Sequence, residues 1–500
     1  MFLLCKYPVL EIIRKGSVEL VFSSLFFLYV FLAIVFLAYY LRKDVKYRNF
    51  VLIIASLVFY AWGEPIWVFM LIFSAWLNWF MGKKIGEYKE TPKAKMCVGI
   101  AIGVDILLLV IFKYTGFLVE NINGLLHTGI PVPHIIMPIG ISFFTFQAIS
   151  YVMDCYWETV PPQKHFYKFL LYLSLFPQLV AGPIVRYSVI EHEIDKRSPT
   201  TVDITEGAMR AIIGLSKKVI LANGLYDIVK QYFGDFLNGN PYNDISSMSF
   251  LGTWFVVICY SLYVYFDFSG YSDIAIGLGR MFGFHFDENF NYPFICKTIS
   301  EFWQRWHISL SSFFRDYLFY MPIFGKQRKY VNLFLVWFCT GLWHGASWNF
   351  IFWGLYFGVF IFIETKIGKK KMKKWNKVLT HIYSKLIIVI GFGIFCFSDM
   401  KQLGNFFVNI SGMGMIFKGN AFAYIATWNS LLNNLFLIIF AIAVSMPILN
   451  KVKYFFNEWG NNTVYTVGKA LGTLVCCYLL VMSSILLVDN TNNPFLYFRF

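Results

Sequence analysis

Long apolar stretches separated by short polar loops run along most of this 500-residue chain. Many of them approach or exceed the ~20 apolar residues that an α-helix needs to cross a bilayer. The clearest are 21–41, 49–62, 65–82, 96–118, 135–153, 380–397, 429–449 and 466–488. The pattern predicts an all-α, polytopic integral membrane protein with about eleven to thirteen membrane segments. We expect one membrane domain over 20–500, which includes an aromatic tail at 494–500.

The middle of the chain, 166–320, departs from this pattern. Its apolar runs are interrupted by many glycines and by Pro177, Pro183 and Pro293. Irregular backbone at membrane depth is tolerated only where it faces protein or a water-filled cavity. We therefore expect broken or re-entrant helices in this region. Residues 205–232 carry a charge every few positions, which predicts an amphipathic helix at the membrane interface.

The composition leaves no room for a sizeable soluble domain, because only 14% of the residues are charged, against roughly 25% in soluble domains. The net charge of +15 gathers in four short loops, at 42–48, 83–95, 326–329 and 366–377. Lysine and arginine resist translocation, so this placement predicts cytoplasmic loops rather than nucleic-acid binding. Attraction of anionic lipid headgroups or of an anionic acyl-CoA remains a further possibility.

Residues 1–19 form a separate N-terminal segment outside the strong pattern. They mix charged and apolar residues without an amphipathic stripe, a cleavage site or a full membrane span. We expect translation to start near Val18 or Val21, which N-terminal sequencing would test.

The nine cysteines lie mostly in apolar segments, and the adjacent pair Cys476 and Cys477 has neither zinc nor redox spacing. They indicate packing, with no disulfide framework and no metal.

Two histidines are the strongest candidates for chemistry, because ionisable groups inside a membrane are expensive. His344 is the only Asp, Glu, Lys, Arg or His between Val331 and Ile363, and Gly341 and Gly345 lie beside it. Small neighbours let a backbone or a thin substrate approach closely. The alternative role is that of a buried histidine with satisfied hydrogen bonds.

His307 lies in EFWQRWHISLSSFFRDYLFY, where charges and large aromatic residues are mixed. Arg305 and Asp316 are potential partners for its ring, so a purely structural role competes more strongly here. A neutral histidine can take a proton from a hydroxyl or thiol and return it to a leaving group. That chemistry suits acyl transfer from a thioester, and no GxSxG, HExxH, Walker or kinase motif offers another.

Six stretches, in family order, resemble the membrane-bound O-acyltransferase (MBOAT) family. The similarity is to its bacterial branch of alginate O-acetylase components, other polysaccharide- and peptidoglycan-acetylating proteins, and the teichoic-acid D-alanylation protein. The stretches are VFSSLFFLYVFL near the start, MPIGISFFTFQAISYVMDCY (137–156), LFPQLVAGPIVRY (175–187), YFDFSGYSDIAIGLGRMFGFHFDENFNYPF (265–294), EFWQRWHISLSSFFRDYLFYMP (301–322) and TGLWHGASWNFIFWGLYFG (340–358).

The resemblance implies the MBOAT fold, with membrane helices and re-entrant segments around a central channel. It places the signature histidine on His344, where a cytosolic tunnel would meet an outer funnel, and the second histidine on His307. The donor would be acetyl-CoA, with no permanently bound cofactor. The channel would be lined or braced by Trp303, Arg305, Trp306, Asp316 and Trp343. A general-base role and a transient acyl-histidine both remain open.

The C-terminal sequence NPFLYFRF is predicted to lie outside, after the last helix. It is either an interfacial aromatic anchor or an acyl carrier, because Phe495-x-Tyr497-x-x-Phe500 resembles a terminal motif of the bacterial branch. A tyrosine ester is a better acyl donor than an alkyl ester, since the phenol pKa is near 10. Tyr497 would then pass the acetyl group onward.

The resemblance implies a multi-pass protein of the bacterial cytoplasmic (inner) membrane. It would acetylate a cell-envelope or exported polysaccharide with an extracytoplasmic serine hydrolase-like O-acetyltransferase as partner.

Two other functions are alternatives to O-acetylation. A transporter or flippase of a lipid-linked saccharide could use His307, Arg305 and Asp316 as a proton relay. A structural subunit would tolerate loss of both histidines. The absence of internal repeats disfavours the transporter, and the polymer stays open.

Overall fold

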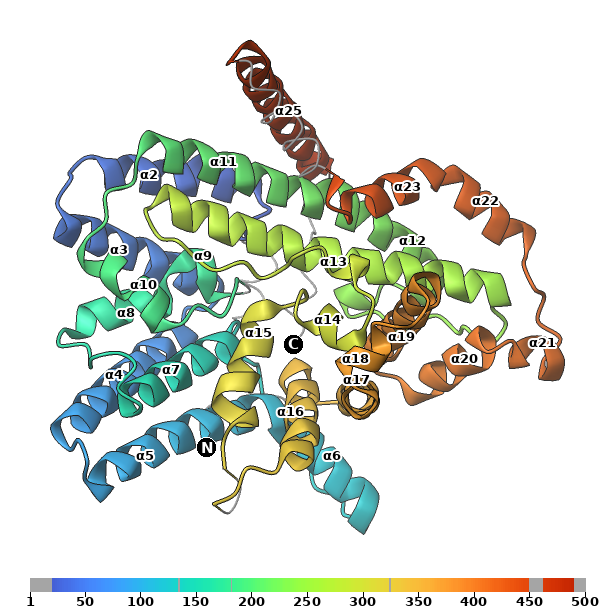
Figure 1. Ribbon diagram of the computed structural model, residues 1–500, viewed down its shortest axis with the longest axis horizontal. Helices are drawn as coiled ribbons and strands as arrows, with labels where there is room; N and C mark the ends of the chain where they lie inside the picture. The colour runs from blue at the N-terminus through green and yellow to red at the C-terminus, as the bar shows by residue number, and fades with distance from the viewer. Residues whose placement is uncertain (1–19, 134, 181, 323–324, 449–461, 490–500) are drawn as a thin grey trace. The chain divides into compact units, whose positions relative to one another are not determined.

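The computed structural model describes residues 20–133, 135–180, 182–322, 325–448 and 462–489 (Figure 1). These residues form helices joined by loops, and no β-sheet is formed among them, which confirms the predicted all-α class. The chain divides into two compact units. The first holds the described residues up to Ala211 together with Ile274–Asp287, and the second holds Ile212–Asp273 and the residues from Glu288 onward.

The first unit packs its helices around α7, which is buried along nearly its whole length. Helices α4 and α5 pack against each other and against α7, and α3 and α4 pack on α8. The elements of this unit are η2 (Phe27–Phe31), α2 (Leu32–Tyr40), α3 (Val45–Gly63), α4 (Trp67–Glu87), α5 (Pro92–Leu109), η3 (Val110–Tyr114), α6 (Thr115–Leu126), α7 (Ile141–Tyr156), α8 (Phe166–Ser174), α9 (Phe176–Leu179), α10 (Tyr187–Asp195) and the start of α11 (Thr201–Ser216).

The second unit has a large core, rich in aromatic residues, to which α12, α13, α14, α16, α17, α19 and α20 all contribute. Its elements are η4 (Lys217–Ala222), α12 (Asn223–Phe233), η5 (Phe236–Asn238), α13 (Phe250–Met281, which ends in the first unit), η6 (Pro293–Ile295), α14 (Ile299–Trp303), α15 (Ile308–Phe314), η7 (Arg315–Phe319), α16 (Lys329–His344), α17 (Trp348–Ile367), α18 (Lys369–Met372), α19 (Lys377–Cys396), α20 (Met400–Ile410), α21 (Met413–Phe417), α22 (Ile425–Asn433), α23 (Leu435–Val444) and α25 (Asn462–Asp489).

Six helices in the described residues are long and apolar enough to cross a membrane, or seven if α22 and α23, bent by 57°, form one span. The six are Val45–Gly63, Pro92–Leu126, Phe250–Met281, Trp348–Ile367, Lys377–Cys396 and Thr466–Val488. The predicted count of about eleven to thirteen is not confirmed. Several apolar stretches instead form shorter helices, such as α7 and α16 with 16 residues each. The protein is nevertheless a multi-pass membrane protein.

The expectation of interrupted helices in 166–320 is confirmed, because this region contains the short elements α8, α9, α10, η6, α14 and α15. Helix α13 runs unbroken for 32 residues. Residues 205–232 lie in one continuous helical run, in which the π-helical turn η4 joins α11 to α12. Lys218, in the π-helix η4, is turned inward and pairs with Asp267 of α13 at 2.6 Å. The charges of this segment are therefore not all at an interface.

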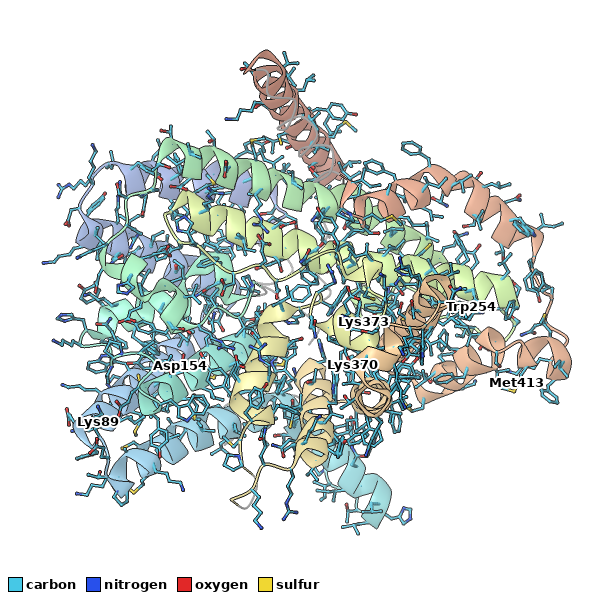
Figure 2. The ribbon with its side chains drawn as sticks, in the orientation of Figure 1. Lys89, Asp154, Trp254, Lys370, Lys373 and Met413 are labelled. Atoms are coloured by element: carbon cyan, nitrogen blue, oxygen red, sulfur yellow. The ribbon has the colours of Figure 1, made fainter. Side chains whose placement is uncertain are left out.

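The lysine-rich loop that follows α17 is exposed, as expected for a loop outside the hydrocarbon. Lys370 and Lys373, which are labelled in Figure 2, are both exposed. The side of the membrane on which this loop lies stays a prediction from the positive-inside pattern.

A capping box begins α11. The Thr200 backbone N–H and hydroxyl donate to Asp203 Oδ2 at 3.0 and 2.7 Å, and the Asp203 N–H donates to Thr200 Oγ1. These bonds from Thr200, with help from Arg280, lower the pKa of Asp203 to about 2.

Asp203→Ala should weaken the first turn of α11 by about 0.5–1 kcal/mol at neutral pH. A lowered pKa gives stability that is present above the ordinary value of about 4 and is lost as the pH falls through about 2. Hydrogen exchange of 200–206 should therefore be faster in the variant at pH 7, with the difference shrinking toward pH 2. Thr200→Ser keeps the hydroxyl and should match the wild type, and equal exchange in all three proteins would contradict the assignment.

Candidate active site

His344 is the last residue of α16, at the turn into α17. The two helices approach closely because glycines face backbone across the interface. A Cβ atom at Gly354 would overlap the Trp337 carbonyl oxygen, and one at Gly341 would overlap that of Phe350. This contact is the most extensive between helices of the second unit. The glycines seen beside His344 in the sequence therefore serve helix packing, which fixes the position of the His344 backbone.

Aromatic rings surround the His344 imidazole, which is only 2% exposed. The ring centroids of Trp343, Trp353 and Phe395 lie 4.9, 4.8 and 5.2 Å from that of His344, all in edge-to-face orientation. Such walls exclude water and lower the local dielectric, so a proton transfer here would not compete with bulk solvent.

His307 is fully buried and precedes α15 in a left-handed backbone conformation, with φ at 44°. Its Nδ1 lies 3.1 Å from Asn289 Oδ1 and 3.4 Å from Ser309 Oγ, and its ring meets the edge of Phe268. His307 lies outside the six candidate membrane spans. Burial lowers the pKa of His307 to about 3, so the imidazole is neutral at physiological pH.

The indole of Trp343 contacts the imidazole rings of both histidines. Its ring lies 5.7 Å from the His307 ring and 4.9 Å from the His344 ring. The structure thus brings together three of the predicted site residues, which come from α16 and from the turn before α15. Both imidazole rings therefore contact one indole, that of Trp343.

Trp303 and Trp306 are buried in the aromatic core that supports this site. Trp303 packs on Trp353, which in turn packs on His344, while Trp306 stacks on Phe302. Both indoles contact other side chains in the core, and the channel role predicted for them stays a prediction.

Arg305 and Asp316 were expected as partners of the His307 ring, but each has a partner close in sequence. Arg305 pairs with Glu301 at 3.0 Å, and Asp316 accepts from Arg315 at 2.7 Å. Arg305 and Glu301 are four residues apart, and Arg315 and Asp316 are neighbours in the chain. Asn289 and Ser309 lie beside His307 Nδ1, and a contact of Arg305 or Asp316 with the His307 ring stays a prediction.

A buried glutamate holds the segment that leads to His307. Glu364 of α17 accepts from the backbone N–H groups of Ile299 and Ser300, at 2.6 and 2.8 Å, and from the Ser300 hydroxyl. A carboxylate at a helix N-terminus is favourable because it satisfies free N–H groups there. Helix α17, which packs against the His344 helix, therefore also anchors α14, and three residues separate the end of α14 from His307.

The sequence did not single out Asn289, Ser309, Trp353, Phe395 or Glu364. The only signal was polarity in an apolar context: Asn289 interrupts the aromatic run FDENFNYPF, and Glu364 closes an otherwise apolar helix. Tyr497, the predicted acyl carrier, lies outside the described residues.

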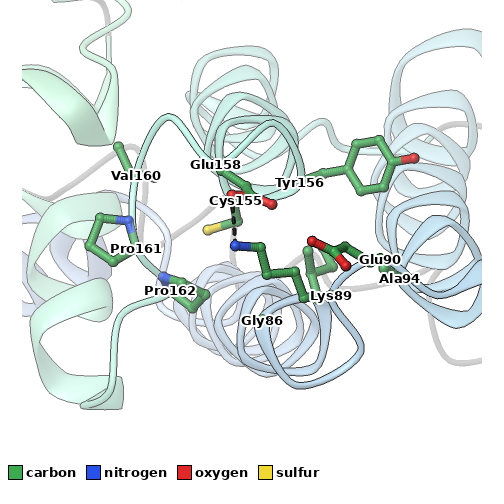
Figure 3. A pocket seen from close by; sticks show the side chains of 11 residues that line it. Gly86, Lys89, Glu90, Ala94, Cys155, Tyr156, Glu158, Val160, Pro161 and Pro162 are labelled. Atoms are coloured by element: carbon green, nitrogen blue, oxygen red, sulfur yellow. Dashed lines mark ion pairs between the residues drawn. The ribbon is translucent and has the colours of Figure 1, made fainter.

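A separate pocket of about 380 Å³ lies in the first unit, between the end of α4 and the end of α7 (Figure 3). Lys89 and Glu158 form an ion pair of 2.8 Å across it, and both side chains are about half exposed. Cys155 and Pro162 belong to its wall. None of the predicted site residues lines this pocket.

These features define a class: a helical, multi-pass membrane protein with two buried histidines in one aromatic site. The sequence pattern of the membrane-bound O-acyltransferase family matches residues 161–398, which contain both histidines. The chain is 37% identical to a probable alginate O-acetylase of Azotobacter vinelandii over 385 residues, 75% of each protein. The chain belongs to the membrane-bound O-acyltransferase family and is an O-acyltransferase.

Two further relatives differ in the polymer that their names give. A peptidoglycan O-acetyltransferase of Helicobacter pylori is 34% identical, over 68% of this chain and 69% of that protein. A teichoic acid D-alanyltransferase of Bacillus subtilis is 31% identical, over 53% of this chain and 70% of that protein. The acyl groups and polymers of these relatives vary within one family.

Proposed function

We propose that this protein passes an acetyl group from cytosolic acetyl-CoA through the membrane for O-acetylation of a cell-envelope or exported polysaccharide. The observation that carries the proposal is the pair of buried histidines on the Trp343 indole. The similarity to alginate and peptidoglycan O-acetyltransferases supports acetyl as the group and a polysaccharide as the final acceptor.

The proposed transfer exchanges a thioester for an oxygen ester. The acceptor hydroxyl attacks the acetyl carbonyl carbon, a C–O bond forms, and the C–S bond to CoA breaks. The hydroxyl proton goes to the His344 imidazole and then to the leaving thiolate, which departs as free CoA. His307 holds or shares this proton through its neutral ring, and Trp303, Arg305, Trp306, Asp316 and Trp343 line or brace the passage.

The first acceptor in this scheme is the Tyr497 hydroxyl, by the likeness of Phe495-x-Tyr497-x-x-Phe500 to a motif of the bacterial branch. An extracytoplasmic serine hydrolase-like O-acetyltransferase would then take the acetyl group from tyrosine to the polymer. This arrangement places the protein in the bacterial cytoplasmic (inner) membrane, with its basic loops in the cytosol.

The test uses full-length protein in nanodiscs with acetyl-CoA that is radiolabelled on the acetyl group. We expect stable label on the wild-type protein and none on Tyr497→Phe, because only the hydroxyl is removed. Tyr478→Phe is the matched control, since Tyr478 is an exposed tyrosine of α25. Label that survives Tyr497→Phe and is lost with His344→Ala would make the tail an anchor and His344 the carrier. Absence of label on the wild type would contradict the relay.

A further inference from the structure

Asn289 occupies a defined place opposite His307. Two backbone hydrogen bonds tie their segments together: Ile308 N–H donates to Asn289 O at 3.0 Å, and Asn291 N–H donates to Arg305 O at 2.9 Å. The Asn289 side chain is fully buried and lies beside the His307 ring. Its position is thus set by main-chain contacts and does not depend on the histidine alone.

The hydrogen bonds around Asn289 decide which way its amide points. The backbone N–H of Ser309 donates to Oδ1 at 3.2 Å, and a backbone N–H can only donate. The opposite amide orientation would turn the NH2 group toward this N–H and set two donors against each other. The Asn289 NH2 group instead donates to Ser272 Oγ at 3.1 Å. The carbonyl oxygen of Asn289 therefore faces the His307 ring.

This orientation determines the proton on the ring. His307 Nδ1 lies 3.1 Å from an oxygen that can only accept, so Nδ1 must carry the hydrogen. The hydroxyl of Ser309 donates to the same oxygen at 2.9 Å, which leaves its own lone pairs facing Nδ1 at 3.4 Å. An unprotonated Nδ1 would place lone pair against lone pair at both contacts. In a neutral imidazole, the lone pair then lies on Nε2.

We propose that Asn289 is a positioning residue that fixes His307 in the Nδ1–H tautomer and so presents Nε2 as the proton acceptor. The value of this tautomer for transfer rests on the proposed function, in which His307 takes part. Asn289 touches neither substrate nor product in this assignment and acts only through the histidine. Removing the partner that orients a functional histidine typically lowers activity by about 10- to 100-fold.

The experiment compares wild type, Asn289→Leu and Asn289→Asp in nanodiscs by ¹⁵N-histidine NMR. Leucine keeps the volume and removes the acceptor, while aspartate keeps an acceptor oxygen toward Nδ1. His307→Asn identifies the His307 signals among the eight histidines. We expect protonated Nδ1 and unprotonated Nε2 in the wild type and Asn289→Asp, and a shift toward protonated Nε2 in Asn289→Leu. Protonated Nε2 in the wild type, or an unchanged tautomer in Asn289→Leu, would overturn the proposal.

Transfer kinetics give the second readout. At saturating labelled acetyl-CoA, Asn289→Leu should slow the labelling rate by about 10- to 100-fold. This loss is smaller than the full contribution of a positioned acid–base group, which is about 10²–10⁴-fold. The half-saturating acetyl-CoA concentration should not change, and Asn289→Asp should recover most of the rate. A changed tautomer with an unchanged rate would overturn the positioning role. Full activity of His307→Asn would instead refute the proposed part of His307 in transfer, while the NMR result for Asn289 would stand.

Ser309→Ala is the control for simple loss of packing. It removes a hydroxyl beside the same ring but leaves the Asn289 oxygen in place. The NMR signals should keep Nδ1 protonated, and the rate should stay within a few-fold of the wild type. A loss as large as that of Asn289→Leu, with no change of tautomer, would show that any change near the ring is damaging and would overturn the specific role of Asn289.

Discussion

Replacing His344 with alanine is expected to lower the rate of acetyl transfer from acetyl-CoA by about 10²- to 10⁴-fold, the range of a positioned acid–base group. The imidazole is the one titratable group enclosed by Trp343, Trp353 and Phe395, and its position is fixed at the end of α16. None of these three neighbours has a side chain that can take a proton from a hydroxyl at neutral pH. The loss should appear as release of free CoA and as labelling of the protein.

Because alanine would leave a cavity in the aromatic site, a second variant separates chemistry from packing. His344→Phe keeps an aromatic ring against the same neighbours and removes both nitrogens. Both variants should be equally inactive, while only His344→Ala should lower thermal stability. His165→Ala, at an exposed position, is the matched control and should keep full activity. Activity in His344→Phe near that of the wild type would exclude an acid–base or nucleophilic role for His344.

The sequence predicts the residues of this site better than their contacts. His344 stands out because a lone imidazole in an apolar stretch has few structural uses. His344 and His307 both contact the Trp343 ring only because the chain turns before α15, and the hydrophobic periodicity of the sequence does not predict that turn. Asn289 and Glu364 act at separations of 18 and 65 residues in the chain. A polar residue that supports a partner so far away looks, in the sequence, like any other polar residue.

For the membrane segments, the sequence predicts the helical stretches but not where each helix breaks. Hydropathy predicts that apolar stretches are helical, which the structure confirms, because every backbone group must be satisfied within the segment. It does not predict where a helix breaks, so the stretch 166–187 contains α8, α9 and the start of α10. Nor does it tell an interfacial lysine from a buried one. Lys218 has the spacing of a surface charge, yet the π-helix η4 turns it toward α13.

Breaking the buried pair of Lys218 and Asp267 on one side only should strongly destabilise the second unit. The side chains of Lys218 and Asp267 are 2% and 1% exposed, and their charged atoms lie 2.6 Å apart. Asp267→Leu should lower the free energy of unfolding by about 3–5 kcal/mol, because it strands a lysine charge in the interior. Lys217 already pairs with Asp273 at 2.6 Å, so Asp273 would not simply take over the second lysine. Unfolding in an SDS titration, followed by tryptophan fluorescence, measures the difference.

Removing both charges should reverse most of the damage, because the attraction within a buried pair mainly offsets the desolvation of its two ions. The double variant Lys218→Met and Asp267→Leu keeps similar volumes and should unfold near the wild type, while Lys218→Met alone should be as unstable as Asp267→Leu. Lys89→Met breaks an exposed pair with Glu158 and should leave the unfolding midpoint unchanged. If the double variant were as unstable as the sum of the two single variants, Lys218 and Asp267 would contribute independently, and the coupling that we predict between their charges would be absent. Near-equality with the wild type would show that the pair adds no net stability to the second unit.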